Sequence, residues 1–167
     1  MRKTRIDGFE LKQAKKEDAK LVHHFITQLA IYEKMEDEVT GGIDELEKNI
    51  WKNEYAEVLL AYYNNEPVGF CLYFTTFSTF TGKGALYLED VYIDIEHRNK
   101  GFGKEIFYQL ACIAKERDYT RFEWVCLDWN ESSIKFYENV IGAKPQKEWI
   151  KFRLDDEGIK NLIEKEQ

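Results

Sequence analysis

The chain of 167 residues has few cysteines and no long apolar run. Its longest apolar run, VLLAYY at residues 58–63, is far too short to span a bilayer. No apolar stretch follows the basic start MRKTRIDGFE, as a signal peptide would require. Cys71, Cys112 and Cys126 are odd in number and lack metal-ligand spacing. We expect no membrane partner and no metal site, and a cytoplasmic protein with reduced, mostly buried thiols.

Positive charge is also in deficit. The 24 Lys and Arg residues against 31 Asp and Glu give a formal net charge of -7. Because nucleic-acid binding needs a dominant basic face, we expect no nucleic-acid partner. An acidic chain is compatible with a cationic small-molecule substrate. The length and the 44% hydrophobic content predict one compact domain, residues 1–167.

The hydrophobic pattern alternates between strand and helix periods. Period-two or continuous apolar segments predict strands at residues 9–14, 57–63, 68–77, 85–93, 122–127 and 149–154. Helical spacing predicts helices at residues 17–35, near 43–50, and at 104–117, 131–140 and 155–167. The turns NNEP and TGKG predict an antiparallel meander of the second to fourth strands. The strand 85–93, the helix from 104 and the strand 122–127 form a βαβ unit, so these two strands are parallel. We expect an α/β (α+β) fold with a mixed, mostly antiparallel sheet.

The loop HRNKGFGKEIF, residues 97–107, gathers glycines and cations at a helix N-terminus. Its first backbone N–H groups lack intrahelical partners, and two glycines allow a bulky anion to approach. Arg98, Lys100 and Lys104 add positive charge. The loop therefore favours a phosphate or pyrophosphate site, with a plain helix start as the alternative. Neither G-x-x-x-x-G-K-[ST] nor G-x-G-x-x-G is present.

The pattern R-x-x-G-x-G, formed by Arg98, Gly101 and Gly103, resembles the acetyl-CoA pyrophosphate loop of the GNAT N-acetyltransferases. The blocks LAIYEKME, LYLEDVYI, RNKGFG and LDWNESSIKFYENVIGA resemble the diamine (spermidine/spermine) and thialysine acetyltransferases, in the same order. The similarity covers roughly residues 9–154. It implies a single GNAT-fold domain with helices on both faces of the sheet, acetyl-CoA as cosubstrate, and a homodimer.

The resemblance also implies which residues bind the cofactor. The pantetheine arm would add beside the strand 85–93 through its backbone, as a strand does. Asn130 matches an asparagine that contacts CoA, and its position before a helix also suits an N-cap. Ser133 is either a pantetheine contact or an ordinary helix serine. The candidate cofactor residues are Val91, Tyr92, Ile93, Arg98, Asn99, Lys100, Gly101, Phe102, Gly103, Lys104, Asn130 and Ser133.

Two catalytic roles follow from the resemblance. Glu89 in LYLED matches the residue that accepts the amine proton and binds the cationic substrate. Strand alternation predicts that Glu89 and Asp90 point to opposite faces. Tyr137 in SIKFYENV matches the tyrosine that protonates the departing CoA sulfur, and an ordinary pKa near 10 keeps a phenol protonated at neutral pH. A core tyrosine beside Phe136 is the alternative for Tyr137.

Acidic and aromatic residues predict the amine-binding side. The candidates are Tyr32, Glu33, Glu89, Asp90, Glu148 and Trp149. A carboxylate and an aromatic ring together suit an ammonium group. The alternative for Glu33 and its acidic neighbours, residues 36–38, is a solvated helix end. Glu148 and Trp149 follow the segment KPQ, whose length differs from the family's.

Three departures from the family pattern bear on the activity. Asn99 replaces the glycine usual after the loop arginine, Ser132 replaces a proline, and Val140 is inserted before IGA. LDWN resembles the thialysine enzymes, whereas SIKFY resembles the polyamine enzymes. We therefore expect an acetyl-CoA-dependent N-acetyltransferase acting on a polyamine or diamine. The alternatives are an acetyltransferase for thialysine, lysine-like amino acids or another small amine, and a non-enzymatic CoA-binding regulatory or interaction module.

Overall fold

The computed structural model describes residues 2–165. Its strands form one sheet in which neighbours in sequence are neighbours in space, in the order β1-β2-β3-β4-β5-β6. Every pair is antiparallel except β5 and β6, which are parallel. The strands are β1 (Arg2–Lys3), β2 (Phe9–Gln13), β3 (Glu57–Tyr63), β4 (Glu66–Ser78), β5 (Lys83–Ile93) and β6 (Phe122–Trp124). The predicted α/β fold class, the meander and the parallel βαβ unit are confirmed.

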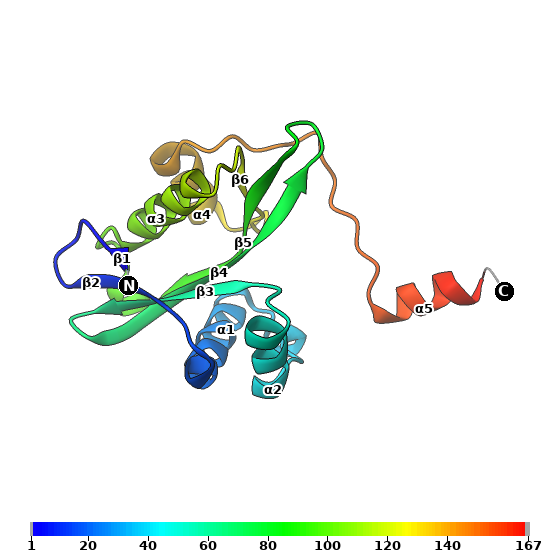
Figure 1. The fold of residues 1–167 in the computed structure, drawn as a ribbon, viewed down its shortest axis with the longest axis horizontal. Helices are drawn as coiled ribbons and strands as arrows, with labels where there is room; N and C mark the ends of the chain where they lie inside the picture. The colour runs from blue at the N-terminus through cyan, green and yellow to red at the C-terminus, as the bar shows by residue number, and fades with distance from the viewer. Residues whose placement is uncertain (1, 166–167) are drawn as a thin grey trace. The chain divides into compact units, whose positions relative to one another are not determined.

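The chain divides into two compact units, one ending at Glu131 and the other beginning at Ser132. In the first unit, α1 and α2 lie on one side of the sheet and α3 lies on the other (Figure 1). The helices of this unit are α1 (Ala19–Glu33), α2 (Ile43–Leu46), which continues as the π-helical turn η3 (Glu47–Lys52), and α3 (Phe102–Glu116). The predicted helices at residues 17–35, 43–50 and 104–117 are confirmed.

The apolar stripe of α1 explains why this helix packs on the sheet. Val22, Phe25 and Leu29 recur at helical spacing and are buried. Phe25 stacks on Phe70 of β4, with ring centroids 6.0 Å apart, and its ring also meets that of Tyr92 on β5. Fully burying such side chains contributes about 1.5–3 kcal/mol each. The core thereby holds α1 against β4 and against the end of β5.

The opposite face of the sheet is covered by α3. Ile106, Leu110 and Ile113 form its buried stripe. At the start of the helix, Phe102 stacks on Phe9 of β2 with ring centroids 4.1 Å apart. Tyr63 at the end of β3 lies 5.0 Å from Phe102, ring to ring. This aromatic group holds the N-terminus of α3, and with it the glycine loop, in a fixed place.

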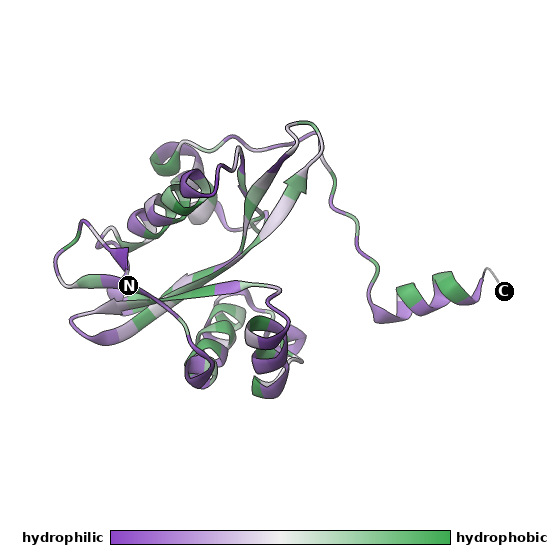
Figure 2. Ribbon diagram, viewed as in Figure 1, coloured by the Kyte–Doolittle hydropathy of each residue, from purple (hydrophilic) through white to green (hydrophobic). Residues whose placement is uncertain are grey.

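The second unit continues the helix that begins at Glu131. It contains most of α4 (Glu131–Phe136), the π-helical turn η5 (Tyr137–Ile141) and α5 (Asp156–Glu164). A π turn closes hydrogen bonds one residue later than an α turn, so it accommodates an extra residue such as Val140. The N-cap Asp155 of α5 accepts a hydrogen bond from the backbone N–H of Gly158 at 2.7 Å. Figure 2 shows that α5 has hydrophobic and hydrophilic sides.

Two predicted strands differ from the structure. Residues 149–154 form no strand, and Ile150, Phe152 and Leu154 are exposed. Alternating apolar residues need a neighbouring edge to supply ladder hydrogen bonds, and no ladder is formed by these residues within the described chain. The predicted strand 122–127 ends early as β6, because pairing with β5 stops at Trp124. That early end shapes the candidate site.

Candidate active site

The glycine loop has the geometry of an anion cradle. After the 3-10 turn η4 (Ile95–His97), Asn99 and Gly101 both adopt left-handed backbone conformations, with φ of 61° and 83°. Successive turns of this kind direct backbone N–H groups outwards, next to the free N–H groups that begin α3. Asparagine tolerates the left-handed region better than most residues, so its replacement of the family glycine keeps the loop shape. The cradle fits a pyrophosphate.

Arg98 fixes the loop to two neighbouring elements. Its Nε donates to the backbone carbonyl of Ile93 at 2.9 Å. Its guanidinium carbon lies 4.4 Å from the Tyr32 ring centroid on α1 and 5.5 Å from that of Tyr92 on β5. Cation–π contacts of this kind are worth about 0.5–2 kcal/mol. Arg98 therefore ties the end of β5 and the end of α1 to the cradle.

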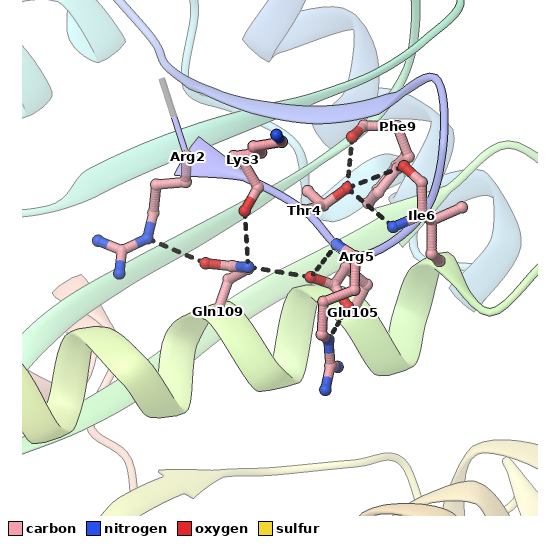
Figure 3. A network of polar contacts seen from close by, with 8 residues as sticks. All are labelled: Arg2, Lys3, Thr4, Arg5, Ile6, Phe9, Glu105 and Gln109. Carbon is pink, nitrogen blue, oxygen red and sulfur yellow. Dashed lines mark hydrogen bonds and ion pairs between the residues drawn. The ribbon is translucent and has the colours of Figure 1, made fainter.

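The N-terminal segment supports α3 from behind the cradle. Glu105 is only 2% exposed, one turn into the helix, and its carboxylate accepts from the side-chain Nε and the backbone N–H of Arg5. Gln109 donates to the same carboxylate at 2.9 Å and to the carbonyl of Lys3 (Figure 3). Because a buried carboxylate is stable only when its oxygens are satisfied, this network holds the start of the chain against α3. Sequence alone gives no sign of these long-range partners.

The edge strand β6 pairs with only part of the length of β5. Their parallel pairing covers only Leu86–Leu88 of β5, opposite Phe122–Trp124. From Asp90 to Ile93, β5 pairs with β4 alone within the described residues. Val91, Tyr92 and Ile93 therefore lie on a stretch whose second edge carries no strand there, where an extended amide-containing arm can add. Tyr92 and Ile93 are buried and Val91 is half-buried.

A β-bulge lies where the two strands separate. Asp90 pairs with Leu72 but Leu88 pairs with Tyr73, so Glu89 is an extra residue on β5. A bulge bends the strand and increases its twist. It also interrupts the two-residue alternation on which the expectation of opposite faces for Glu89 and Asp90 rests, so that expectation stays a prediction. Glu89 is exposed and Asp90 is half-buried.

Near this bulge, the charges of two carboxylates, Glu89 and Glu33, act on a third, Asp90. Burial, and then the charges of Glu89 and Glu33, raise the pKa of Asp90 from its ordinary 3.8 to about 7. Burial also raises the pKa of Glu33, the last residue of α1. Burial and the Glu33 charge raise the pKa of the Cys126 thiol. The helix end, the bulge and the segment after β6 thus form one acidic environment.

Tyr32 and Asn130 connect the two sides of this environment. The Tyr32 hydroxyl donates to Oδ1 of Asn130 at 3.5 Å, the long limit for a hydrogen bond. Asn130 is 7% exposed and directly precedes α4, as predicted. The Arg98 guanidinium lies over the ring of the same tyrosine. The structure therefore places Tyr32 between two predicted cofactor residues and one position from Glu33.

The remaining predicted residues belong to the second unit. Ser133 lies on α4 and is half-buried, and Tyr137 begins η5 with its ring against Phe136, centroids 5.6 Å apart. Glu148 and Trp149 are exposed. The roles of these four residues stay predictions. Within residues 2–165, no cluster of three or more His, Cys, Asp or Glu side chains could hold a metal ion, and no helix is long and apolar enough to cross a membrane.

Sequence reasoning missed three features of the site. These are the bulge at Glu89, the half-buried position of Asp90 and the contact of Arg98 with Tyr32. Two consecutive acids inside an otherwise apolar strand were the available signal for the first two. No local pattern reports a contact between residues 66 positions apart.

Comparisons with known proteins agree with this geometry. Residues 23–143 match the family model described as acetyltransferase (GNAT) family. The chain is 30% identical to a thialysine N-epsilon-acetyltransferase of Caenorhabditis elegans over 94% of this chain and 98% of that protein. It is 29% identical to the human spermidine/spermine N(1)-acetyltransferase-like protein 1, over 97% of this chain and 25% of that protein. An integron cassette protein from V. cholerae superposes with a TM-score of 0.78 at 25% identity, covering 93% of this chain and 98% of that one.

The fold and the family model define an acyl-transferring enzyme. The chain belongs to the GNAT acetyltransferase family and is an N-acetyltransferase. Enzymes of this family use acetyl-CoA. The family match confirms the resemblance found in the sequence blocks and argues against the non-enzymatic alternative.

Proposed function

We propose that residues 1–167 form one acetyltransferase domain that moves the acetyl group of acetyl-CoA to a primary amine of a small polycationic acceptor, a polyamine or diamine. The observation that carries this proposal is the acidic group formed by Glu33, Glu89 and Asp90, with the Asp90 pKa raised to about 7. An ammonium group is the natural partner of such an environment, because it offsets the mutual repulsion of the carboxylates.

The cofactor residues act mainly through their backbone. The N–H groups at Asn99, Gly101 and the start of α3 would hold the pyrophosphate, with positive charge from Lys100 and Lys104. Val91 and Ile93 would pair with the pantetheine amides along the uncovered edge of β5. This arrangement would bring the thioester to the bulge. Asn130 and Ser133 would contact the same arm.

The chemistry needs a neutral amine and a stable leaving group. Deprotonating an alkylammonium of pKa near 10.4 at neutral pH costs about 4 kcal/mol, so a carboxylate that accepts the proton lowers the barrier. Glu89, by its match to the family, and its neighbour Asp90 are the candidates at the bulge. Tyr137 would give its phenolic proton to the departing CoA thiolate. Tyr32, Glu33, Glu148 and Trp149 would complete the acceptor site.

The acceptor is identified by a panel of amines with acetyl-CoA, followed by free thiol release. Spermidine, spermine, a short diamine, thialysine and lysine are compared with a monoamine and an aminoglycoside. We expect a polyamine or diamine to give the highest kcat/KM. Thialysine is the second candidate, because the C. elegans relative is named for it. A preference for the monoamine would contradict the polycation proposal while leaving acetyl transfer intact.

Replacing single carboxylates should separate binding from chemistry. Glu33→Gln should raise KM for a diamine about fivefold with kcat nearly unchanged, because one partly exposed charge pair is worth about 1 kcal/mol. Glu89→Gln should change both kcat and KM. Steady-state kinetics check this, and Glu38→Gln on the exposed turn η2 (Glu36–Glu38) serves as a control that should change neither. Equal effects of Glu33→Gln and Glu38→Gln would remove Glu33 from the acceptor site.

A homodimer and a cytoplasmic location complete the proposal. Free thiols at Cys71, Cys112 and Cys126 support a reducing compartment. The exposed apolar side chains of the second unit support a contact with a second copy; they are Ile150, Phe152, Leu154, Ile159, Leu162 and Ile163.

Charge placed in that apolar group should therefore weaken the dimer. For Phe152→Asp we expect at least a tenfold increase in the dimer dissociation constant, because a buried contact would acquire an unpaired carboxylate. Sedimentation equilibrium measures it, and Lys151→Asp, at the exposed neighbouring position, is the matched control. A wild-type protein that sediments as a monomer would contradict the dimer directly.

A further inference from the structure

Asp90 occupies an unusual place for a carboxylate. It is opposite Leu72 on β4, and two residues further along β5 Tyr92 is opposite Phe70. Leu72, Phe70 and Tyr92 belong to the apolar cluster that packs against α1. Side chains of residues paired across a sheet lie on the same face, so Asp90 lies at the border of that cluster. It is the acidic member of an otherwise apolar or aromatic row.

The charges around Asp90 are all of its own sign. Glu89 is its neighbour on β5 and Glu33 is at the end of α1, and both act on Asp90 electrostatically. On β4, the residue opposite Asp90 is the apolar Leu72. After β6, burial and the charge of Glu33 raise the pKa of the Cys126 thiol. Within residues 2–165 no hydrogen bond or ion pair joins the Asp90 carboxylate to a cation. The Arg98 guanidinium, at the other end of this part of the sheet, is held by Ile93 and two aromatic rings.

Glu89 is in a different environment although it is adjacent. It is the extra residue of the bulge and is exposed to solvent. Partial burial beside like charges favours the protonated form of a carboxylate and makes it a better proton acceptor, and of the two neighbours only Asp90 is partly buried. Burial and like charge give Asp90 a pKa of about 7, which is suited to a base that works near neutral pH. Asp90 is therefore better suited than Glu89 to accept the proton.

We propose that Asp90, rather than Glu89, accepts the proton of the attacking amine, and that Glu89 and Glu33 instead attract and hold the cationic acceptor. This inference rests on the proposed amine acetyl transfer. The acceptor arrives as R–NH₃⁺ and gives one proton to the Asp90 carboxylate. The amine nitrogen then forms a bond to the thioester carbonyl carbon, and the carbon–sulfur bond breaks. The thiolate takes the Tyr137 proton. The acetylated nitrogen gives its remaining extra proton to the Tyr137 phenolate, which restores the phenol, and Asp90 releases its proton to solvent after turnover, so one proton is released in all.

The position of Asp90 also explains how binding of the charged acceptor favours the ionised, basic form of Asp90. Without a cation, burial and then the charges of Glu89 and Glu33 keep a proton on Asp90 up to about pH 7. An approaching ammonium group favours the ionised form of Asp90. A diamine carries a second ammonium group, which stays charged beside Glu33 and Glu89 while the first is deprotonated. Acceptors with two amines should therefore react better than monoamines through this arrangement.

The test is the pH dependence of kcat/KM for a diamine between pH 5.5 and 9.5. The wild type should rise through about pH 7 and then level off, because the reactive form contains ionised Asp90 and a protonated amine. Asp90→Asn should lose this limb and fall at least a hundredfold at pH 7.5. Its residual rate should increase tenfold per pH unit towards the pKa of the amine. Glu89→Gln is the matched control and should keep the limb, moved to lower pH because the Glu89 charge helps to raise the pKa of Asp90.

Two readouts keep the inference testable if Asp90→Asn folds poorly. Carboxyl ¹³C NMR of wild-type protein labelled at aspartate should show one carboxyl titrating near pH 7, and only ordinary values near 4 would overturn the inference. In thermal unfolding, Asp90→Asn should gain stability over wild type as the pH rises from 5 to 8. The raised pKa means that the native wild type binds more protons than the unfolded chain in this range, so its stability falls as pH increases.

The outcomes separate this inference from the proposed function. If the wild type acetylates no polyamine, diamine or lysine-like amine, the proposed function is wrong. If it acetylates them and the limb near pH 7 is lost in Glu89→Gln but kept in Asp90→Asn, Glu89 is the base and the inference is wrong. If both variants keep the limb, Asp90 has no part in the proton transfer.

Discussion

Tyr137→Phe should lower kcat by about 10² to 10⁴ with little change in protein stability. The substitution removes only the hydroxyl and keeps the ring that lies against Phe136. A positioned proton donor is typically worth this much, because the thiolate must otherwise leave unprotonated. Stopped-flow or steady-state measurement of thiol release gives the rate, and calorimetry gives acetyl-CoA affinity, which should stay within about twofold.

A control tests whether the hydroxyl itself matters. Phe136→Leu alters the neighbouring ring and retains the phenol, so it should keep kcat within about tenfold while lowering stability. A Tyr137→Phe protein within twofold of wild type would reduce Tyr137 to a packing residue. Equal losses in the two variants would point to disturbed packing of η5 instead of proton donation.

Gly101→Asp should weaken acetyl-CoA binding at least tenfold, or about 1.4 kcal/mol. Gly101 has φ of 83°, a conformation that is strained for aspartate, and the new carboxylate would face the position of the pyrophosphate. Isothermal calorimetry with acetyl-CoA measures the loss. The site beside Gly101 has room for a small side chain, since an added Cβ would come no closer than 3.5 Å to Ile6 Cδ1.

Gly101→Asn is the matched control. It has nearly the size of aspartate, tolerates a positive φ and carries no charge. It should retain most of the affinity, so the difference between the two variants reports the charge of the ligand. If the folded Gly101→Asp protein bound acetyl-CoA as tightly as the wild type, the cofactor would bind elsewhere on the chain.

The elements that sequence predicted well have strong local periodicity. The stripe of Val22, Phe25 and Leu29 repeats at helical spacing, and the α1 helix forms where this pattern is. The meander followed from the turns at NNEP and TGKG, and the parallel pair followed from the handed βαβ connection. The periodicity of each element lies within about 15 residues, and the parallel pair follows from the order of elements along residues 85–127, so the sequence contains both signals directly.

The features that sequence missed depend on distant partners. The bulge at Glu89 arises from the register of β5 on β4, which is set by packing along both strands. The pKa of Asp90 depends first on burial, then on the charge of Glu89 and on that of Glu33, which lies more than 50 residues away in the sequence. The alternation at residues 149–154 predicts a strand only if an edge is available to it, and the residues form none. The sequence thus identified the residue types of the site, but not which of two adjacent carboxylates is partly buried.

The measurement that tests the central claim most directly is the ratio of kcat/KM for spermidine to that for a monoamine of similar length, taken at 20 mM and 500 mM salt. The acidic group at Glu33, Glu89 and Asp90 predicts a ratio well above ten at low salt. That ratio should fall several-fold at high salt, because screening weakens the second charge contact. A ratio near one at both salt concentrations would contradict a polycationic acceptor.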